Sequence, residues 1–477
     1  MEDEYLHALD SVPLSDIVRS EYRTYQIYTL MDRAIPYLKD GLKPGQRRIL
    51  FTLYKNQSKG LVKVSAATGL VLTLHPHGPA SIESTIVNLA QDYTFSNNYP
   101  LIDKKGYFGE RMETSPAAGR YIECKLGKLA EFLIFDDMNQ VKMIPNYDET
   151  VMEPEGLLPK LPLMLLNGAE GIGTGFSSVI PAFHHKDIIA SMIQCVVKGK
   201  AKKIKPFFHH YTEQIIADKG RFLFPMRFEE IAGKIHITEI PRGYDAAKVY
   251  RFLTKWIDKD YIKDFTDSSV GNDINIELIF KRGQQPTLKE VQDKMKTTSS
   301  ISPNYTLISE RGVRIFKTPD EIISIFTEQR LAVVKRRYEL LMEESKARIQ
   351  QNSEIVKFIK NKEYIVATKS ANRRTFVDYL GSKRYKYSDY LADMPIYRMT
   401  KDEVKKRQLL ITEDQKKLKE YTKIAGSKAL VKKKLVEELG LVDTKMNEWL
   451  KAKEQEKKKL EKKGQKRGKK TKKRLRQ

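Results

Sequence analysis

One tyrosine in the sequence directly follows an arginine, and this pair could perform chemistry on a phosphodiester. Tyr121 follows Arg120 in the segment SPAAGRYIE, where small residues allow the backbone to approach another molecule closely. A phenol is a weak nucleophile at neutral pH because its pKa is about 10. A neighbouring cation lowers that pKa and stabilises charge on a phosphoryl group. The alternative is an ordinary arginine beside a half-buried tyrosine, and the dipeptide alone favours it because the chain has 24 tyrosines.

Two histidines lie just before an expected helix start. His75 and His77 flank Pro76 and precede Pro79, which fits the first position of a helix. Such a helix end attracts anions, so the imidazoles could contact a phosphate there. The alternatives are a turn with solvated histidines and a metal site, although no third ligand has suitable spacing. The pairs His184-His185 and His209-His210 also lack a third ligand and are expected at the surface.

Four cations and a glycine-rich segment are further candidates for phosphate contact. Arg33, Lys43, Arg47 and Arg48 surround two turns in DRAIP and DGLKPGQRR. A solvated basic face is the alternative for these cations. The segment NGAEGIGTG is neither a GxxxxGK[ST] loop nor a convincing dinucleotide fingerprint, and no GxxxxGK[ST] motif occurs in the sequence. ATP hydrolysis is therefore not predicted for this chain.

The charge of the chain indicates a polyanionic partner. The 477 residues include 86 Lys or Arg and 61 Asp or Glu, for a net charge of +25, and the apolar content of 40% excludes a wholly disordered protein. Nucleic acid is the first expectation and an anionic membrane surface the minor one. Two cysteines fit a reducing compartment. Neither a membrane-spanning run nor a secretory signal is recognised, so we expect a cytoplasmic, DNA-associated protein.

The expected elements mix helices with strands. Pro44 and Pro79 each open a helix with an apolar face, and short helices in a basic region are compatible with a helix-turn-helix module. Alternating apolar positions in KIHITEI and INIELIF predict strands, with a helix over AAKVYRFLTKWI between them. Thr318 and Pro319 open a long helix expected to end near Lys360, and a second long helix begins at Thr400.

The order of these motifs resembles one protein family. DRAIPYLKDGLKPGQRRIL, HPHG, TIVNLAQ, GYFGERMETSPAAGRYIE and LPLMLLNGAEGIGTGFSSVIP follow one another as in the DNA breakage–reunion region of type IIA topoisomerases. The resemblance is dense over residues 25–181 and fainter at LADMPIYRMTKDE. The chain resembles the separate breakage–reunion (A-type) subunit of T-even-type phage topoisomerases, which implies a phage origin and the cytoplasm of a host cell.

The resemblance implies a role for each matching residue. Tyr121 would be the nucleophile that forms a 5′-phosphotyrosyl link. Arg120, Arg33 and His77 would stabilise charge on the phosphate. The supporting DNA contacts would come from Lys43, Arg47, His75 and Ile172, and Ile172 would insert between base pairs. No metal ligand is assigned within this chain.

The resemblance also implies a multidomain α/β (α+β) architecture. It comprises a winged-helix domain with the nucleophilic tyrosine, an α+β tower domain, and a long antiparallel coiled coil with a small globular gate. The expected divisions are an N-terminal arm (1–25), the winged-helix domain (26–150), the tower (151–317), a coiled-coil helix (318–360), a C-gate dimerisation tip (361–400), a returning helix (401–440) and a basic disordered tail (441–477).

The implied function is transient double-strand DNA cleavage and religation with ATP-dependent duplex passage, leading to relaxation or decatenation. Double-stranded DNA and a second copy of the chain, joined through the C-gate, would be partners. A separate ATPase–Toprim subunit would hold the Mg²⁺ and use the ATP. The alternative is a non-enzymatic architectural DNA-binding protein, which would share the composition but would not need Tyr121.

Overall fold

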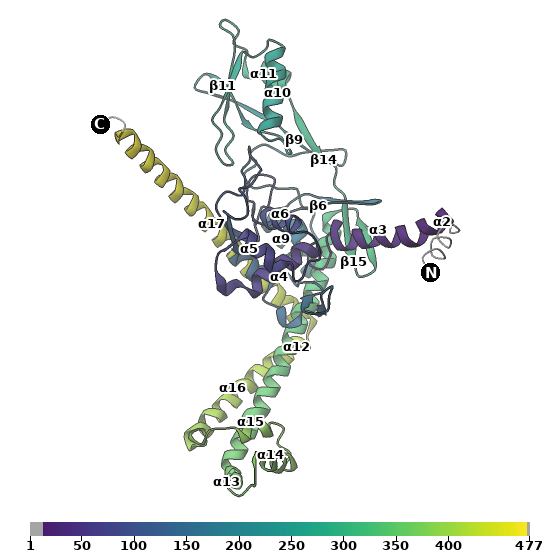
Figure 1. Cartoon of the computed structure of the whole chain (residues 1–477), viewed down its shortest axis with the longest axis vertical. Helices are drawn as coiled ribbons and strands as arrows, with labels where there is room; N and C mark the ends of the chain where they lie inside the picture. The colour runs from purple at the N-terminus through teal and green to yellow at the C-terminus, as the bar shows by residue number, and fades with distance from the viewer. Residues whose placement is uncertain (1–12, 475–477) are drawn as a thin grey trace, which may run out of the picture. The chain divides into compact units, whose positions relative to one another are not determined.

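The chain forms two compact units in the computed structural model, which describes the backbone of residues 13–474 and the side chains of residues 13–459. One unit comprises residues 330–437, and the other comprises the remainder of the described chain. The larger unit mixes helices with several small antiparallel sheets, which confirms the α+β class at this level (Figure 1). Residues 1–12 of the expected N-terminal arm lie outside the described residues.

The described chain begins with a helical segment that runs up to the first candidate residues. Its last turn buries Leu30 and Ala34, whereas its earlier turns are exposed. It changes between α- and π-helical geometry, and its parts are α2 (Leu14–Ile17), η1 (Val18–Tyr22), α3 (Arg23–Thr29) and η2 (Leu30–Ala34).

Three helices and a three-stranded sheet pack together after this segment. Proline occupies the first position of α4 (Pro44–Lys55) and of α6 (Pro79–Ala90), which confirms both predicted helix starts. Ile49, Leu50 and Leu53 of α4 are buried, as the apolar pattern predicted. The other members are α5 (Val64–Val71) and the antiparallel strands β1 (Val62–Lys63), β3 (Glu123–Leu126) and β2 (Ile102–Lys105), in that order.

Short elements connect this group to the next helix. The β6–β7 hairpin, a two-stranded antiparallel sheet, contains the predicted glycine-rich segment. The elements are η3 (Gln57–Lys59), α7 (Lys128–Ile134), η4 (Met138–Gln140), β4 (Met143–Pro145), β5 (Met152–Pro154), α8 (Leu163–Leu166), β6 (Ala169–Gly173), β7 (Phe176–Ile180) and α9 (His185–Lys198).

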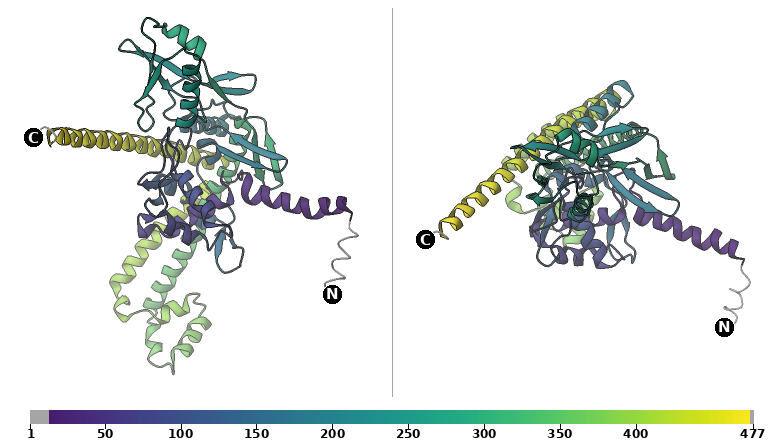
Figure 2. Two further views of the ribbon diagram at one scale, coloured as in Figure 1. Left: turned by 45° about the horizontal axis from the view of Figure 1, so that its top comes forward. Right: turned by 90° about the horizontal axis from the view of Figure 1, so that it is seen from above.

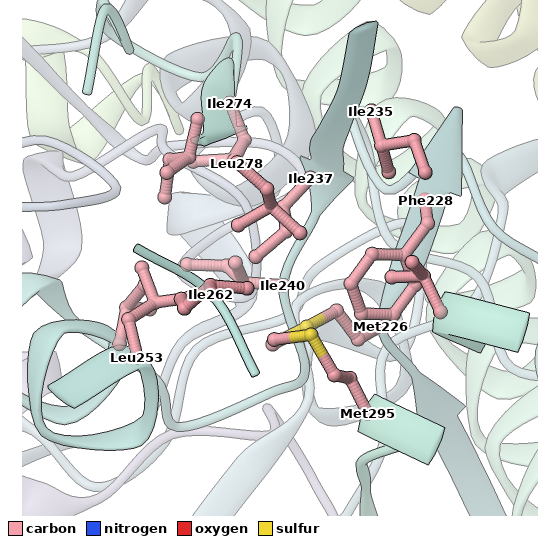
Figure 3. Packing of buried hydrophobic residues seen from close by; sticks show 13 residues of the cluster. Met226, Phe228, Ile235, Ile237, Ile240, Leu253, Ile262, Ile274, Leu278 and Met295 are labelled. Atoms are coloured by element: carbon pink, nitrogen blue, oxygen red, sulfur yellow. The ribbon is translucent and has the colours of Figure 1, made fainter. Parts of the chain in front are cut away.

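A second core belongs to a four-stranded antiparallel sheet in the order β10-β11-β13-β12. Its apolar side packs against two helices, and Figure 3 shows the buried side chains, Ile237, Leu278 and Leu253 among them. The predicted strands and intervening helix are confirmed here. The elements are β10 (Arg227–Ile231), β11 (Lys234–Glu239), α10 (Ala246–Asp258), β12 (Asp264–Asp267), β13 (Ile276–Ile279) and α11 (Leu288–Met295).

The remaining strands form two further sheets. One has the order β14-β9-β8 and the other is the β15–β16 hairpin. Their strands are β8 (Ile216–Asp218), β9 (Arg221–Pro225), β14 (Thr298–Ile301), β15 (Tyr305–Ser309) and β16 (Gly312–Phe316).

The smaller unit is an antiparallel helix pair with a helical tip. Helix α12 (Pro319–Lys360) has the predicted bounds, and its later part lies beside α16 (Lys401–Ala425) in Figures 1 and 2. Two contacts show that the helices run in opposite directions. Arg348 pairs with Asp414 (3.2 Å), and Asn352, further along α12, accepts from Arg407, which is earlier in α16 (2.9 Å). The tip has its own buried core and consists of α13 (Tyr364–Ala367), α14 (Arg373–Ser382), α15 (Ser388–Ala392) and η5 (Ile396–Arg398).

The last helix corrects two predictions. The expected single returning helix is interrupted at Gly426, and α17 (Lys428–Arg474) follows. The expected disordered tail from residue 441 is wrong for the described backbone, which is helical to Arg474. The first part of α17 is held by packing, since Leu439, Val442 and Met446 are all fully buried, whereas the side chains of residues 451–459 are exposed. Within residues 13–474, no helix is long and apolar enough to cross a membrane.

Candidate functional site

Tyr121 projects from a turn at the start of strand β3. Its side chain is 66% exposed, and the guanidinium of Arg120 lies over the ring at 4.7 Å from the centroid. The turn is fixed from within, because the Tyr121 N–H donates to the carbonyl of Ala118 (2.8 Å). The next residue, Ile122, is buried and accepts from the N–H of Val64 (3.0 Å). The arrangement presents a phenol to solvent with a cation against its ring.

Arg33 and His77 form a second polar cluster. Arg33 lies at the end of η2, and His77 lies two residues before α6. The Arg33 Nη2 is 2.9 Å from His77 Nδ1, and His77 Nε2 is 3.3 Å from a carboxylate oxygen of Asp32. Arg33 is exposed and His77 is half-buried. The structure therefore brings these two predicted residues together, with a carboxylate that orients the imidazole.

His75 contacts His77 and is held by hydrogen bonds and ion pairs of other residues. Its ring meets that of His77 edge-on at 4.7 Å, and its Nδ1 is 3.3 Å from Nη1 of Arg48. Arg48 in turn makes a bidentate pair with Glu153 (2.7 and 3.0 Å). Burial, followed by the nearby His77 and Arg48, lowers the pKa of His75 to about 4. His75 is therefore neutral at pH 7 and positions its neighbours.

Arg47 differs from its predicted role. It is 6% exposed, and its Nε donates to a carboxylate oxygen of fully buried Asp40 at 2.6 Å. Its guanidinium also lies over the ring of Tyr37. A side chain committed to this pair is not available to a phosphate, so the predicted direct DNA contact of Arg47 is not supported.

Lys43 is likewise occupied within the protein. Its Nζ donates to the carbonyl oxygen of Glu170 at 2.7 Å, which links the start of α4 to strand β6. Burial lowers the pKa of Lys43. This cation stabilises the position of the hairpin in the structure.

The β6–β7 hairpin lies against η2 through its glycines. A Cβ on Gly171 would be 1.8 Å from the carbonyl oxygen of Ala34, and one on Gly173 would be 2.5 Å from Leu30. Successive side chains of a strand point to opposite faces, so Ile172 points away and is 89% exposed. The alternation of glycine with larger residues thus explains both the close packing and an apolar side chain in solvent.

The site residues form two groups that α6 connects. Arg33, His77 and His75 precede α6, whereas Arg120 and Tyr121 lie in the turn that a side chain of α6 contacts. Sequence reasoning missed the acidic partners, most of which pair with a residue distant in the sequence, although Asp40 is only seven residues from Arg47. Asp32 and Asp40 were visible beside predicted cations. Glu83 of α6, which accepts from the Gly119 N–H, and Glu153 had no signal that joined them to the site.

Histidines expected at the surface include one that is buried. His185 is fully buried, with its Nδ1 2.7 Å from the hydroxyl of Tyr99. The prediction failed because both the aromatic partner and the covering helix α17 come from distant parts of the chain. Trp449 of α17 lies 6.2 Å from Tyr99, centroid to centroid.

The side chains described here do not form a metal site. Among them, no group of three or more His, Cys, Asp or Glu residues could hold an ion. The cluster around His77 pairs its imidazole with the carboxylate of Asp32, and its histidine and arginines are unsuited to Mg²⁺, which prefers oxygen ligands. The residues present do not fit this metal.

Comparison with known proteins places this geometry in a family. A family model that describes the A subunit of DNA gyrase/topoisomerase IV matches residues 33–440. The chain belongs to this family. All eight candidate residues lie in the matched range, so the type IIA A-type resemblance is confirmed at the level of the family.

Relatives of the chain include both topoisomerase 2 proteins and gyrase A subunits. It is 30% identical to the mitochondrial DNA topoisomerase 2 of Dictyostelium discoideum over 74% of the chain and 28% of the relative. Identity to DNA topoisomerase 2 of Saccharomyces cerevisiae is 31%, over 76% and 27%. Identity to the DNA gyrase A subunit of Kosmotoga olearia is 29%, over 89% and 57%. The chain thus spans less than a third of these topoisomerase 2 proteins and over half of this gyrase protein.

Proposed function

We propose that this chain cleaves and religates DNA as the A-type part of a type IIA topoisomerase. The phenolic oxygen of Tyr121 forms a bond to a backbone phosphorus while the bond from phosphorus to the 3′ oxygen breaks. The phenol loses its proton and the departing 3′ oxygen gains one, leaving a 5′-phosphotyrosyl link and a free 3′-hydroxyl. The ester retains the energy of the broken bond, so religation is the reverse step and needs no nucleotide.

The observation that carries this proposal is the exposed phenol of Tyr121 with the Arg120 guanidinium against its ring. The chain that holds this pair matches the family model. Arg120 is placed to stabilise the charge on the phosphate as it is attacked. Arg33 and His77 form a cationic and hydrogen-bonding group just before the N-terminus of α6, and both would contact the phosphate. Asp32 would keep the His77 imidazole oriented.

The surrounding elements support a DNA-binding role. We interpret α4–α6 with the sheet β1-β3-β2 as the expected winged-helix domain, and the β-rich region after it as the tower. Ile172, exposed on its hairpin, would insert between base pairs and bend the cleaved segment. The excess of 86 basic over 61 acidic residues supports binding of the DNA backbone.

The smaller unit would join two copies of the chain. We interpret its antiparallel helices as the coiled coil and residues 361–400 as the dimer gate. Ile396 is 82% exposed and Tyr397 is 70% exposed at this tip, and such apolar side chains are expected at a protein interface. Each copy would then cleave one DNA strand, and a double-strand break needs both.

Metal and nucleotide chemistry would come from a partner. We propose that a separate ATPase–Toprim subunit provides the carboxylates for Mg²⁺ and the site for ATP. The metal would supply charge stabilisation at the scissile phosphate. ATP would be used to pass a second duplex through the break, in relaxation or decatenation.

Tyr121→Phe tests the proposal when the chain is co-purified with its ATPase–Toprim partner. With Mg²⁺ and labelled DNA, a denaturing gel should detect covalent DNA on the wild type and on Tyr147→Phe, a control at another exposed tyrosine (55%). Tyr121→Phe should lose covalent DNA by more than about 10³-fold, since the nucleophile is gone. Covalent DNA on Tyr121→Phe, or DNA binding without covalent product in the wild type, would contradict the proposal and favour an architectural protein.

A further inference from the structure

The turn that bears Tyr121 is held by a carboxylate of helix α6. Glu83 is half-buried, and its Oε1 accepts the backbone N–H of Gly119 at 3.0 Å. A Cβ built on Gly119 would lie 2.4 Å from the same oxygen. A side chain at position 119, two residues before the phenol, would therefore displace the Glu83 carboxylate from this contact.

The same turn has other anchors, among them the N–H of Val64 donating to the Ile122 carbonyl and the N–H of Ala117 donating to the Tyr107 carbonyl, both at 3.0 Å. The carbonyl of Gly119 accepts from the N–H of Ser65 (3.3 Å). Lys63 Nζ donates to the carbonyl of Tyr121 at 3.4 Å and forms an ion pair with Glu123. The Glu83 contact is as short as the two backbone bonds at 3.0 Å, and among the contacts named it is the one in which a carboxylate accepts from the turn backbone. Hydrogen bonds to an ionised acceptor are roughly twice as strong as neutral ones.

We propose that Glu83 is a positioning residue that fixes the Tyr121 phenol and the Arg120 guanidinium for attack on the phosphate. This inference rests on the proposed function. Glu83 acts through the Gly119 N–H and does not itself contact the reacting atoms. Its place on α6 also joins the Tyr121 turn to the helix that His77 precedes, so one rigid element controls both groups of the site.

A positioning role makes a kinetic prediction that a general loss of structure does not. A residue that orients the nucleophile stabilises the transition state shared by cleavage and religation. Its removal should slow both steps equally and leave the fraction of covalent DNA at equilibrium unchanged. A misfolded or weakly binding variant would instead lower that fraction.

The experiment compares Glu83→Met, which removes the acceptor, with Glu83→Gln, which keeps one. Single-turnover cleavage and religation are followed with the partner-containing complex, Mg²⁺ and labelled DNA. Glu83→Met should slow both rates by about 10- to 100-fold, with the equilibrium covalent fraction and DNA affinity within about two-fold of wild type. Glu83→Gln should remain within about three-fold, and the control Glu131→Met, exposed on α7, should match wild type.

The outcomes separate this inference from the proposed function. Wild-type rates in Glu83→Met, equal losses in Glu83→Gln and Glu83→Met, or an equal loss in Glu131→Met would overturn the positioning role while Tyr121 could still cleave. Absence of covalent DNA in the wild type would overturn the proposed function. If Glu83→Met does not fold, Gly119→Ala replaces it, and slowing of both rates by that variant supports the role while wild-type rates refute it.

Discussion

An experiment on Arg47 can distinguish a direct DNA contact from a structural ion pair. Its Nε and Nη2 approach the two oxygens of Asp40 at 2.6 and 3.3 Å. Asp40 is fully buried and also accepts the N–H groups of Leu42 and Leu157, both at 3.1 Å. The pair thus joins the turn before α4 to the segment around residue 157.

Replacing Arg47 by Met would leave the Asp40 carboxylate buried without its cation. Breaking one side of a buried pair typically costs about 3–5 kcal/mol. The two backbone N–H bonds to Asp40 remain, so we expect the lower end, about 3 kcal/mol, in the free energy of unfolding. DNA binding should keep its salt dependence, since a buried guanidinium neutralises no phosphate.

The assay combines urea unfolding with DNA affinity measured over a series of salt concentrations. Each lost phosphate contact reduces the slope of log K against log salt by about 0.9. Arg120→Met is the matched control, because this exposed arginine should lower the slope while changing the free energy of unfolding by less than about 0.5 kcal/mol. Unchanged stability of Arg47→Met together with a reduced salt slope would refute the structural role.

Two further predictions concern packing and pH. Gly171→Ala should lower the free energy of unfolding by about 1–3 kcal/mol, because the new Cβ would be 1.8 Å from the Ala34 carbonyl oxygen. The control Gly69→Ala, which has open space around it in α5, should be neutral or stabilising. Equal unfolding midpoints for the two variants would contradict this prediction. Burial lowers the pKa of His75 to about 4 and of His209 to about 3, below the usual 6.5, so the folded state binds fewer protons than the unfolded state. Their stabilisation is complete above pH 6.5 and is lost as pH falls, down to about 4 for His75 and about 3 for His209. The melting temperature measured across pH 4–8 should fall toward the acid end, and the fall should be smaller in His209→Phe. The same pH profile in His209→Phe and the wild type would contradict the role of His209.

Local signals in the sequence predicted the helix starts and the apolar faces. Proline at positions 44, 79 and 319 fixes a backbone angle suited to the first turn of a helix, so all three starts were predictable. The strands β11 and β13 followed from alternation of apolar residues. These features depend on near neighbours in the chain.

Features that depend on distant neighbours were not predictable. Lys43 was interpreted as available to DNA because its partner, the Glu170 carbonyl, is 127 residues away. Asp40 is only seven residues from Arg47, but nothing in the sequence shows that this pair is buried. The packing of α17 was missed because its buried side chains such as Val442 and its aromatic contact with Tyr99 depend on parts of the chain far away in the sequence. The contact of Glu83 with Gly119 spans 36 residues and needed coordinates.

The most direct test of the central claim identifies the amino acid that becomes linked to DNA. Cleavage complexes trapped by denaturant are digested with nuclease and trypsin, and the modified peptide is sequenced by mass spectrometry. We predict a nucleotide attached through its 5′ phosphate to the first residue of YIECK, which is Tyr121, with free 3′-hydroxyl ends on the DNA. A nucleotide on any other residue, or a 3′-linked product, would contradict the account.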